Sequence, residues 1–344
     1  MALRLLCVVA LFGVACGDDS SAPVDAQAEA SLDAAPPVDQ SVIDEGMMDA
    51  EVAVEVGADE GMDERVIAPG DPSVLGPRTL SETEDRVGDT PVVAYVPEGG
   101  GPLVVFAPGF LLESAFYEST MRHIASHGFV VVRTDPPMSF ATPDHVAIRD
   151  DMRAVVDWSL RDAPFASQVD AGRIAAVGHS LGGKAATMLA LADSRITALV
   201  AIDPVDGGGF IPSDRTPDIV PSDMDGLVIA SAFLGETTNG SGGFMPCAPT
   251  DNNFQRFYEA ATRATVAYEF DFLGADHMDF LSERSACGRL CGACDEGSAD
   301  DAAVAAGTNT IVTAFLRLRF FVESGMTQWL DGASRPADVN VRSR

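Results

Sequence analysis

Short apolar runs alternate with longer amphipathic stretches along most of the chain after residue 75. The short runs are rich in β-branched residues and have the length of buried strands. In the longer stretches apolar residues recur every three or four positions, as in helices with one buried face. The pattern predicts strands at 90–99, 101–109, 129–135, 173–178, 196–203, 226–235 and 264–274, and helices at 114–128, 143–163, 252–262 and 302–324, with a further helix between the strands at 173–178 and 196–203.

This alternation predicts an α/β fold with a mostly parallel central sheet flanked by helices. The strands at 90–99 and 101–109 are separated only by a Gly-rich turn, and we expect them to be adjacent. No internal repeat interrupts the pattern. The expected organisation is therefore one α/β domain over residues 75–335, followed by a flexible C-terminal tail at 336–344.

The first 16 residues, MALRLLCVVALFGVAC, are typical of a secretory signal peptide. They carry one positive charge, at Arg4, and an apolar run too short to span a membrane. The run ends in Gly-Val-Ala-Cys at 13–16, which resembles a bacterial lipobox, although Gly13 stands where a leucine-like residue is usual. We therefore expect an exported cell-envelope lipoprotein attached to a membrane through a lipid at Cys16, with plain secretion as the alternative.

Composition predicts that residues 17–74 are an acidic, disordered tether. Between Gly17 and Glu64 there are 15 acidic residues and no basic one. Because the tether carries about half of the formal net charge of −30, that charge says little about the partners of the folded part. Lys184 is the single lysine, and the arginines form no clustered basic stripe, so we expect no nucleic-acid partner.

Four cysteines remain after Cys7 in the signal and Cys16 in the lipobox. In an exported domain they favour two disulfides, with three possible connectivities that the sequence does not rank. Their spacing could instead hold zinc, although an oxidising compartment disfavours this. In either case we interpret them as structural; they are Cys247, Cys287, Cys291 and Cys294.

The stretch RIAAVGHSLGGKAATMLALA (173–192) contains the main candidate for chemistry. Ser180 is expected on the turn between a strand and a helix, where Gly178 and Gly182 leave room for a sharp bend. This is the nucleophile elbow of an α/β hydrolase, in which backbone strain lifts the hydroxyl into the open. The alternative is a tight strand-to-helix turn with an incidental serine.

A serine hydroxyl needs a base, and in this fold the order along the chain is serine, acid, histidine. His277 is the one histidine of five that follows Ser180, so it is the expected base. His179 leaves the turn in another direction and is not expected to reach the hydroxyl.

Two carboxylates compete for the role of the acid. Asp203 ends the apolar run ITALVAID and precedes a proline, whereas Glu236 follows GLVIASAFLG. Asp203 has the more enclosed setting, which the acid needs to orient the imidazole. Three other carboxylates are interpreted as solvated loop residues without a role: Asp206, Asp276 and Asp279.

An oxyanion hole needs two backbone N–H groups, which we assign to Leu181 and Phe110. Gly109 permits the bend that aims the N–H of Phe110 inward. A wall for a long acyl or alkyl chain could come from apolar residues near the elbow, although these could equally belong to the core: Phe110, Leu111, Leu112, Leu181 and Met278.

Five segments in this order resemble the chlorophyllase family of α/β hydrolases: GFLLESAFYESTMRHIASHGFVVV, GHSLGGKAAT, ALVAIDPVDG, CAPTDNNFQRFYEA and ADHMDFLSE. Some of them recur in dienelactone hydrolases, bacterial polyester hydrolases and platelet-activating-factor acetylhydrolases. The resemblance implies a catalytic serine, aspartate and histidine, with the aspartate at Asp203. Plant members commonly have arginine where this chain has Leu181.

The resemblance implies a serine carboxylic ester hydrolase that needs no cofactor or metal and cleaves an ester with a long apolar chain, in the family chlorophyll to chlorophyllide and phytol. Two alternatives remain at this stage. One is another exported lipase, esterase or polyester hydrolase, and the other is a catalytically silent, lipid-anchored binding module.

Overall fold

One sheet runs through the part of the chain that the computed structural model describes, which is residues 70–344 without 140–142, 208–212, 221, 238–245 and 290. The chain divides into two units, 1–64 and 65–344, and all described residues belong to the second. The expected signal peptide, Cys16 and most of the expected tether lie outside the described residues. The strands of the sheet are β1 (Leu80–Val87), β2 (Thr90–Pro97), β3 (Gly101–Ala107), β4 (Val130–Thr134), β5 (Val169–His179), β6 (Ile196–Ile202), β7 (Ala230–Gly235), β8 (Ala267–Phe272) and β9 (Val339–Ser343).

The strand order is β1-β2-β4-β3-β5-β6-β7-β8-β9. The strands from β4 through β8 in this order pair in parallel, whereas β1, β2 and β9 join antiparallel. The expectation that 90–99 and 101–109 are adjacent is wrong, because β4 lies between β2 and β3. A parallel core brings the carboxyl ends of β3, β5, β6, β7 and β8 to one edge of the sheet, where the loops that follow them can meet.

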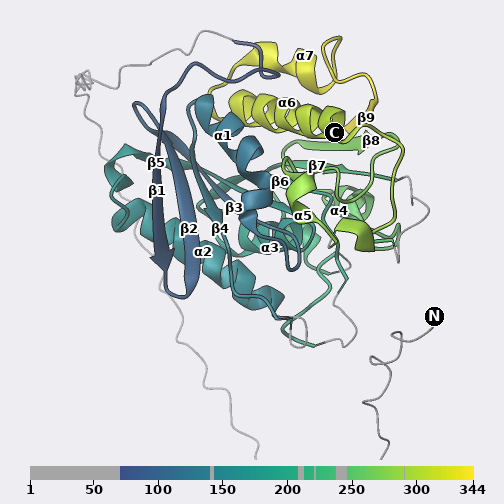
Figure 1. Ribbon diagram of the computed structural model, residues 1–344, viewed down its shortest axis with the longest axis horizontal. Coiled ribbons are helices and arrows are strands. Elements are labelled where there is room, and N and C mark those ends of the chain that lie inside the picture. The colour runs from purple at the N-terminus through teal and green to yellow at the C-terminus, as the bar shows by residue number, and fades with distance from the viewer. Residues whose placement is uncertain (1–69, 140–142, 208–212, 221, 238–245, 290) are drawn as a thin grey trace, which may run out of the picture. The chain divides into compact units, whose positions relative to one another are not determined.

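Helices cover both faces of the sheet (Figure 1). They are α1 (Glu118–Ser126), α2 (His145–Arg161), α3 (Leu181–Ala192), α4 (Phe254–Ala260), α5 (Arg284–Cys287), α6 (Asp301–Phe320) and α7 (Thr327–Leu330), with short 3₁₀ turns η1 (Ser114–Tyr117), η2 (Ala166–Gln168), η3 (Met224–Gly226), η4 (Cys291–Ala293) and η5 (Ser324–Met326). The predicted helix at 114–128 is therefore a 3₁₀ turn followed by α1. The N-cap aspartates of α2 and α6, Asp144 and Asp300, each accept a backbone N–H of the first turn.

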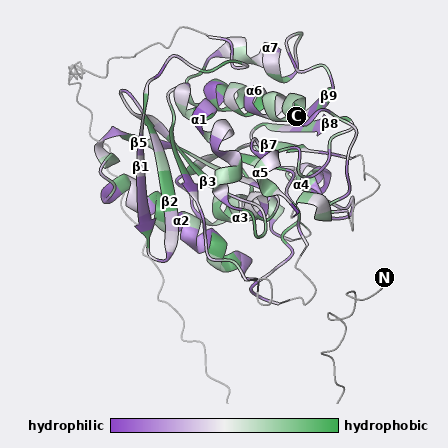
Figure 2. Ribbon diagram, in the orientation of Figure 1, coloured by the Kyte–Doolittle hydropathy of each residue, from purple (hydrophilic) through white to green (hydrophobic). Residues whose placement is uncertain are grey.

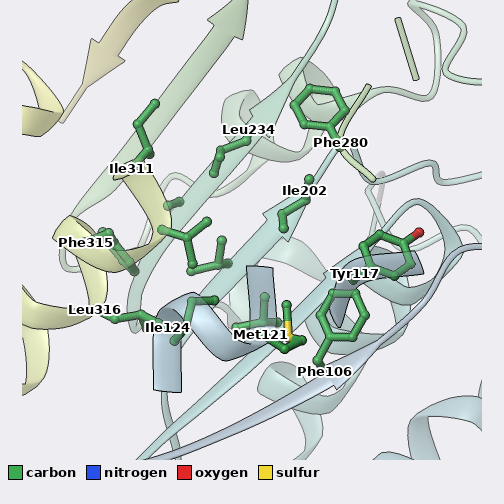
Figure 3. Close-up of a cluster of buried hydrophobic side chains, with 14 of the residues drawn as sticks. Phe106, Tyr117, Met121, Ile124, Ile202, Leu234, Phe280, Ile311, Phe315 and Leu316 are labelled. Atoms are coloured by element: carbon green, nitrogen blue, oxygen red, sulfur yellow. The ribbon is translucent and has the colours of Figure 1, made fainter. Parts of the chain in front are cut away.

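Two hydrophobic cores lie on opposite faces of the sheet. Val104 and Val131 face a cluster that includes residues of α1 and α6, and Figure 3 shows Met121, Ile124 and Phe315 within it. Val105 and Val132, one position further along the same strands, face the cluster that includes residues of α2, α3 and α4. Because successive side chains of a strand point to opposite faces, continuous apolar runs are required to fill both cores. Among the described residues, no helix combines the length and apolarity needed to cross a membrane.

The two outermost strands are the elements that hydrophobic patterning does not predict. β1 reads LSETEDRV, has only polar and charged residues between its terminal leucine and valine, and is among the most hydrophilic strands in Figure 2. β9 occupies 339–343, so the expectation of a flexible tail at 336–344 is wrong. Both strands have one neighbour only, and charges on an edge strand discourage pairing with other chains.

The last residues of the expected tether also belong to the folded part. The rings of His123 and His127 on and after α1 bond to the carbonyl oxygens of Pro72 and Val74, at 2.9 and 3.0 Å. Arg317 of α6 donates to the carbonyl of Gly70 at 2.8 Å. The ordered domain therefore begins by residue 70, rather than after a tether that continues to residue 74.

Candidate active site

Ser180 stands between β5 and α3 in a backbone conformation that few residues other than glycine adopt. Its φ is +55° and its ψ is −122°. Its N–H donates to the carbonyl of Ile202 in β6 at 2.9 Å, and its own carbonyl accepts the N–H of Lys184 in the first turn of α3 at 3.1 Å. The surrounding sheet and helix thus hold a strained residue in place, as expected for a nucleophile elbow.

The two flanking glycines are required by close backbone contacts. A Cβ on Gly178 would lie 2.2 Å from the carbonyl oxygen of Gly182, and a Cβ on Gly182 would lie 2.1 Å from that of Ala107. Any side chain at either position would push α3 away from the ends of β3 and β5. The elbow is therefore as tight as the sequence predicts.

The loops after β6 and β8 bring Asp203 and His277 to Ser180. Nε2 of His277 lies 2.9 Å from Oγ of Ser180, and Nδ1 lies 2.6 Å from Oδ2 of Asp203. Because the carboxylate accepts the Nδ1 hydrogen, Nε2 presents its lone pair to the serine hydroxyl. All three residues are buried, and Ser180 is the most exposed of them, at 9%.

The absence of a side chain at Gly235 leaves space for the carboxylate of Asp203. A Cβ on Gly235 would lie 2.5 Å from Oδ1 of Asp203, so only glycine there leaves room for the acid. Burial raises the pKa of Asp203, and the hydrogen bond from His277 partly offsets this. Its backbone N–H donates to the carbonyl of Leu234 at 2.6 Å, which fixes it to the end of β7.

The other candidate acid, Glu236, contributes its backbone instead. Its N–H points to Oδ1 of Asp203 at 3.4 Å, while Asp203 holds the bond to the imidazole. The interpretation of the neighbouring aspartates as solvated is wrong. Asp206 is buried against Lys184, with 3.1 Å between Oδ1 and Nζ, and Asp276 and Asp279 are buried in the loop of His277.

The loop after β3 lies beside Ser180, where the oxyanion hole is expected. A Cβ on Gly109 would lie 3.2 Å from Cβ of Ser180, so Phe110 follows within a residue of the candidate nucleophile. Leu181 is the first residue of α3, and the N-terminus of a helix favours negative charge. Both predicted donors therefore lie close to Ser180 along the chain or in space.

Phe110 and Leu181 also line a cavity of about 160 Å³. The other lining residues are mostly apolar, namely Pro137, Met138, Pro143 and Ile148. Two polar residues, Ser139 and Asp144, complete the lining. The remaining wall candidates lie elsewhere. Leu112 and Met278 belong to the hydrophobic core, and Leu111 is 38% exposed. Two of the five residues proposed for a substrate wall therefore line this cavity, and the rest of its lining comes largely from the segment before α2.

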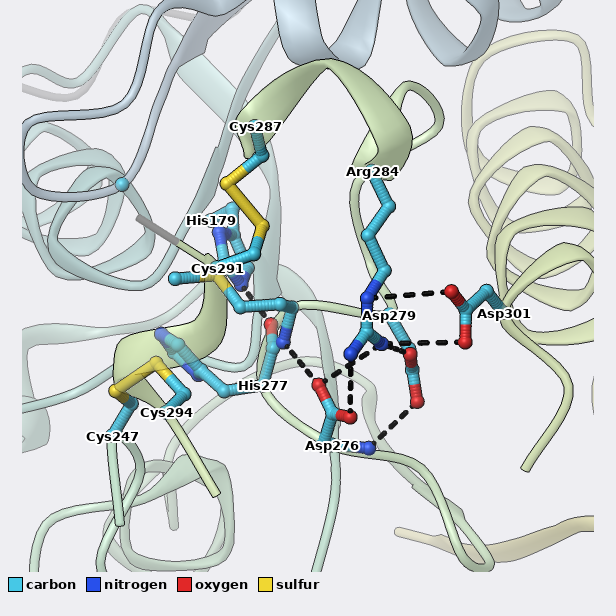
Figure 4. The surroundings of a disulfide bond; sticks show 12 residues. His179, Cys247, Asp276, His277, Asp279, Arg284, Cys287, Cys291, Cys294 and Asp301 are labelled. Carbon is cyan, nitrogen blue, oxygen red and sulfur yellow. Dashed lines mark hydrogen bonds and ion pairs between the residues drawn. A yellow bond between two sulfur atoms is a disulfide. The ribbon is translucent and has the colours of Figure 1, made fainter. Parts of the chain in front are cut away.

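The loop that carries His277 is braced by ion pairs and disulfides (Figure 4). Arg284 pairs with Asp276, Asp279 and Asp301, and Asp276 also accepts the N–H of Gly297 at 2.9 Å. The loop closes on itself where the carbonyl of Gly274 accepts the N–H of Ser298 at 2.7 Å. These contacts neutralise the buried carboxylates and hold the imidazole over the sheet edge.

The four cysteines form two disulfides, Cys247–Cys294 and Cys287–Cys291. The expectation of two structural disulfides is confirmed, and the structure selects one of the three connectivities. Since the thiols are bonded in pairs, they are not zinc ligands. Among the described residues, no group of three or more histidines, cysteines or acidic residues is arranged to hold a metal ion.

Two buried residues of the site were not predicted from sequence. Tyr117 at the end of η1 bonds to Nδ1 of His179 at 2.7 Å, and Nε2 of His179 lies 3.0 Å from the carbonyl oxygen of His277. Both ring nitrogens of His179 are thus bonded to groups other than Ser180, and no pattern in the sequence indicates these partners. The two rings meet only because the loops of β3, β5 and β8 converge.

A mostly parallel sheet with helices on both faces and a strained serine on a strand-to-helix turn define an α/β hydrolase. Comparison with known proteins identifies the group within this class. The family model for chlorophyllase matches residues 75–335, and the chain belongs to the chlorophyllase family.

Individual relatives agree with this assignment. Chlorophyllase-1 of Arabidopsis thaliana is 32% identical over 267 residues, which cover 70% of this chain and 80% of the relative. Chlorophyllase-2 of the same plant is 31% identical over 214 residues, which cover 56% of this chain and 64% of the relative. Cutinase 2 of Thermobifida cellulosilytica is 32% identical over 125 residues, which cover 36% of this chain and 47% of the relative. The chain is a carboxylic ester hydrolase.

Proposed function

We propose that the protein is a serine hydrolase that cleaves esters with an apolar chain through an acyl-enzyme. The observation that carries the proposal is the line of hydrogen bonds from Ser180 Oγ to His277 Nε2, at 2.9 Å, and from His277 Nδ1 to Asp203, at 2.6 Å. In this arrangement His277 can accept the serine proton at the moment of attack.

The reaction proceeds in two halves. Ser180 Oγ attacks the ester carbonyl carbon while its proton passes to Nε2 of His277, and the N–H groups of Phe110 and Leu181 hold the resulting oxyanion. The carbon–oxygen bond to the alcohol then breaks, and His277 returns the proton to the leaving alcohol. Water repeats the sequence on the acyl-enzyme and releases the acid. Throughout, Asp203 orients the imidazole and stabilises its protonated form.

The apolar lining next to Phe110 and Leu181 supports a substrate with an aliphatic chain. The cavity of about 160 Å³ is smaller than the roughly 300–1,000 Å³ typical of pockets that enclose a whole ligand. It therefore accommodates part of a long chain. A phytyl ester such as chlorophyll fits this requirement, and so does an aliphatic polyester.

Assays of the full chain and its Ser180→Ala variant on short aliphatic esters, chlorophyll and an aliphatic polyester test the proposal. We expect wild type to cleave chlorophyll and the short esters, and the variant to show no turnover above blank. Turnover of the short esters alone would contradict a chlorophyllase-type substrate. Activity of the variant comparable to wild type would contradict the serine mechanism.

We also propose that the protein is exported and anchored through a lipid at Cys16. The lipobox-like Gly-Val-Ala-Cys at 13–16 supports this. Expression in bacteria with a labelled fatty acid tests it, with Cys16→Ser as the matched control. Label and membrane association are expected in wild type and not in the variant. An unlabelled wild-type protein in the medium would support plain secretion.

A further inference from the structure

Two buried aromatic side chains with polar groups, which the candidate mechanism does not use, link the loops that carry it. Tyr117 and His179 are fully buried, with exposures of 1% and 0%. Tyr117 Oη also accepts the backbone N–H of Gly109, at 3.3 Å. Together with the bonds from Tyr117 to His179 and from His179 to His277, this makes a continuous chain of hydrogen bonds from the loop of Phe110 to the loop of His277.

The acceptors fix the direction of every hydrogen in this chain. The carbonyl of His277 can only accept, so Nε2 of His179 carries the hydrogen and donates it (Figure 4). Nδ1 of His179 is therefore an acceptor, and the Tyr117 hydroxyl donates to it at 2.7 Å. The oxygen lone pairs of Tyr117 remain for the Gly109 N–H. Each group is thus a donor or an acceptor in each bond, and reversing the direction of any one hydrogen bond would break another.

The environment keeps both rings in these forms. Burial, together with the nearby His277, lowers the pKa of His179 well below 6.5, so its ring stays neutral. Burial raises the pKa of Tyr117, so its hydroxyl stays protonated. The rings are also packed: Tyr117 lies 4.8 Å from Phe106 and His179 lies 4.6 Å from His277, between ring centroids. Close packing of this kind restricts the movement of both side chains.

We propose that Tyr117 and His179 are positioning residues. They fix the position of the oxyanion loop at Gly109–Phe110 relative to the base His277. The inference rests on the proposed function, since it assigns these loops their roles. The two groups must act on the same carbonyl, one on its oxygen and one on the attacking serine. A displacement of about 1 Å between such groups is enough to cost roughly 100-fold in rate.

Three variants of the full chain separate positioning from bulk packing. Tyr117→Phe keeps the ring and removes the hydroxyl. His179→Leu removes both hydrogen bonds of the imidazole. His179→Gln replaces them, because its amide can donate to the His277 carbonyl and accept from Tyr117. Tyr268→Phe is the control, since Tyr268 is a buried tyrosine near the amino end of β8, at the opposite end of that strand from the His277 loop.

With a short ester we expect kcat to fall roughly 10–100-fold in Tyr117→Phe and at least as far in His179→Leu, with KM within about twofold of wild type. His179→Gln is expected to recover most of the loss, and Tyr268→Phe to match wild type. Circular dichroism and thermal unfolding show that each variant is folded at the assay temperature.

Several results would overturn the inference. These are kcat within about twofold of wild type in both Tyr117→Phe and His179→Leu, a loss in His179→Gln as large as in His179→Leu, or a change confined to KM. The proposed function fails separately, through activity of Ser180→Ala. An inactive Ser180→Ala beside unaffected Tyr117→Phe and His179→Leu would remove the positioning role alone.

Discussion

The carboxylate of Asp203 has room beside His277 because residue 235 is a glycine and because Asp203 itself adopts a positive φ of +38°. A missing side chain in β7 and an unusual backbone conformation just after β6 thus together make room for one acid. Glu236, one residue after Gly235, lies on the same edge and is also buried, yet it contacts Asp203 through its backbone N–H. The choice between the two carboxylates is made by backbone geometry rather than by residue type.

Asp203→Asn is expected to lower kcat by roughly 10⁴-fold, because an amide cannot hold His277 in the required tautomer. Glu236→Gln keeps its backbone N–H and is expected to retain activity within a few-fold of wild type. Steady-state kinetics on a short ester measures both. A large loss in Glu236→Gln with little loss in Asp203→Asn would assign the acid to Glu236.

Chain-length preference should follow the apolar cavity beside Leu181. Burying a methylene stabilises by about 0.8 kcal/mol, so kcat/KM should rise up to roughly fourfold per added carbon and then level off once the cavity is full. Phe110→Ala keeps the backbone N–H and removes the ring from the lining, so the rise should be weaker. If kcat/KM rose equally with ester chain length in wild type and in Phe110→Ala, the aliphatic chain of the substrate would bind elsewhere.

At the residue scale, chain order and a glycine-flanked serine predict Ser180 and His277, and the apolar strand before Asp203 favours it over Glu236. The fold brings these three side chains within hydrogen-bond distance. Tyr117 and Arg284 could not be found in this way. Their partners are more than 60 positions away or lie on a loop whose path the apolar pattern does not determine. Buried charges next to the site, such as Lys184 with Asp206, likewise look solvated in sequence.

At the scale of elements, the parallel strands are predictable because they are buried on both faces and are therefore continuously apolar. β1 and β9 are half exposed at the sheet edges and carry charges, so their sequences resemble loops. The order of β2, β4 and β3 is a property of the chain's long-range path, which a Gly-rich turn does not reveal. The cysteine pairing depends on the same long-range path.

The two disulfides should differ in their effect on stability. Cys247–Cys294 joins residues 47 positions apart, whereas Cys287–Cys291 spans four. By loop-closure entropy, the first is worth about 4 kcal/mol and the second about 2 kcal/mol. Denaturant unfolding of Cys247→Ser/Cys294→Ser and of Cys287→Ser/Cys291→Ser compares them. A smaller loss in the first pair than in the second would contradict this account.

For the whole molecule, buried histidines contribute to the dependence of stability on pH. Burial lowers the pKa of His127 and of His145 from 6.5 to about 4. Well above pH 6.5 each is neutral in both the folded and the unfolded chain and contributes nothing to the pH dependence. As the pH falls from 6.5 to 4, each of these histidines is protonated in the unfolded chain but stays neutral in the folded chain. The free energy of unfolding therefore decreases as the pH falls through this range.

At pH 5 the expected loss is roughly 2 kcal/mol for each of these two histidines relative to pH 7.5. Urea denaturation of wild type and His127→Gln at both values measures it. The glutamine can still donate to the carbonyl of Val74 and does not titrate, so the variant should lose roughly 2 kcal/mol less than wild type. An equal pH dependence in the two proteins would mean that His127 does not contribute.

The central claim is that His277 activates Ser180, and covalent labelling of the whole protein tests it most directly. A fluorophosphonate probe reacts with an activated serine, and mass spectrometry of the digested protein locates the adduct. We expect one adduct on Ser180 in wild type, none in Ser180→Ala, and labelling slowed by at least roughly 100-fold in His277→Ala. Folded wild-type protein without an adduct on Ser180, or His277→Ala labelled as fast as wild type, would contradict the account and favour a catalytically silent binding module.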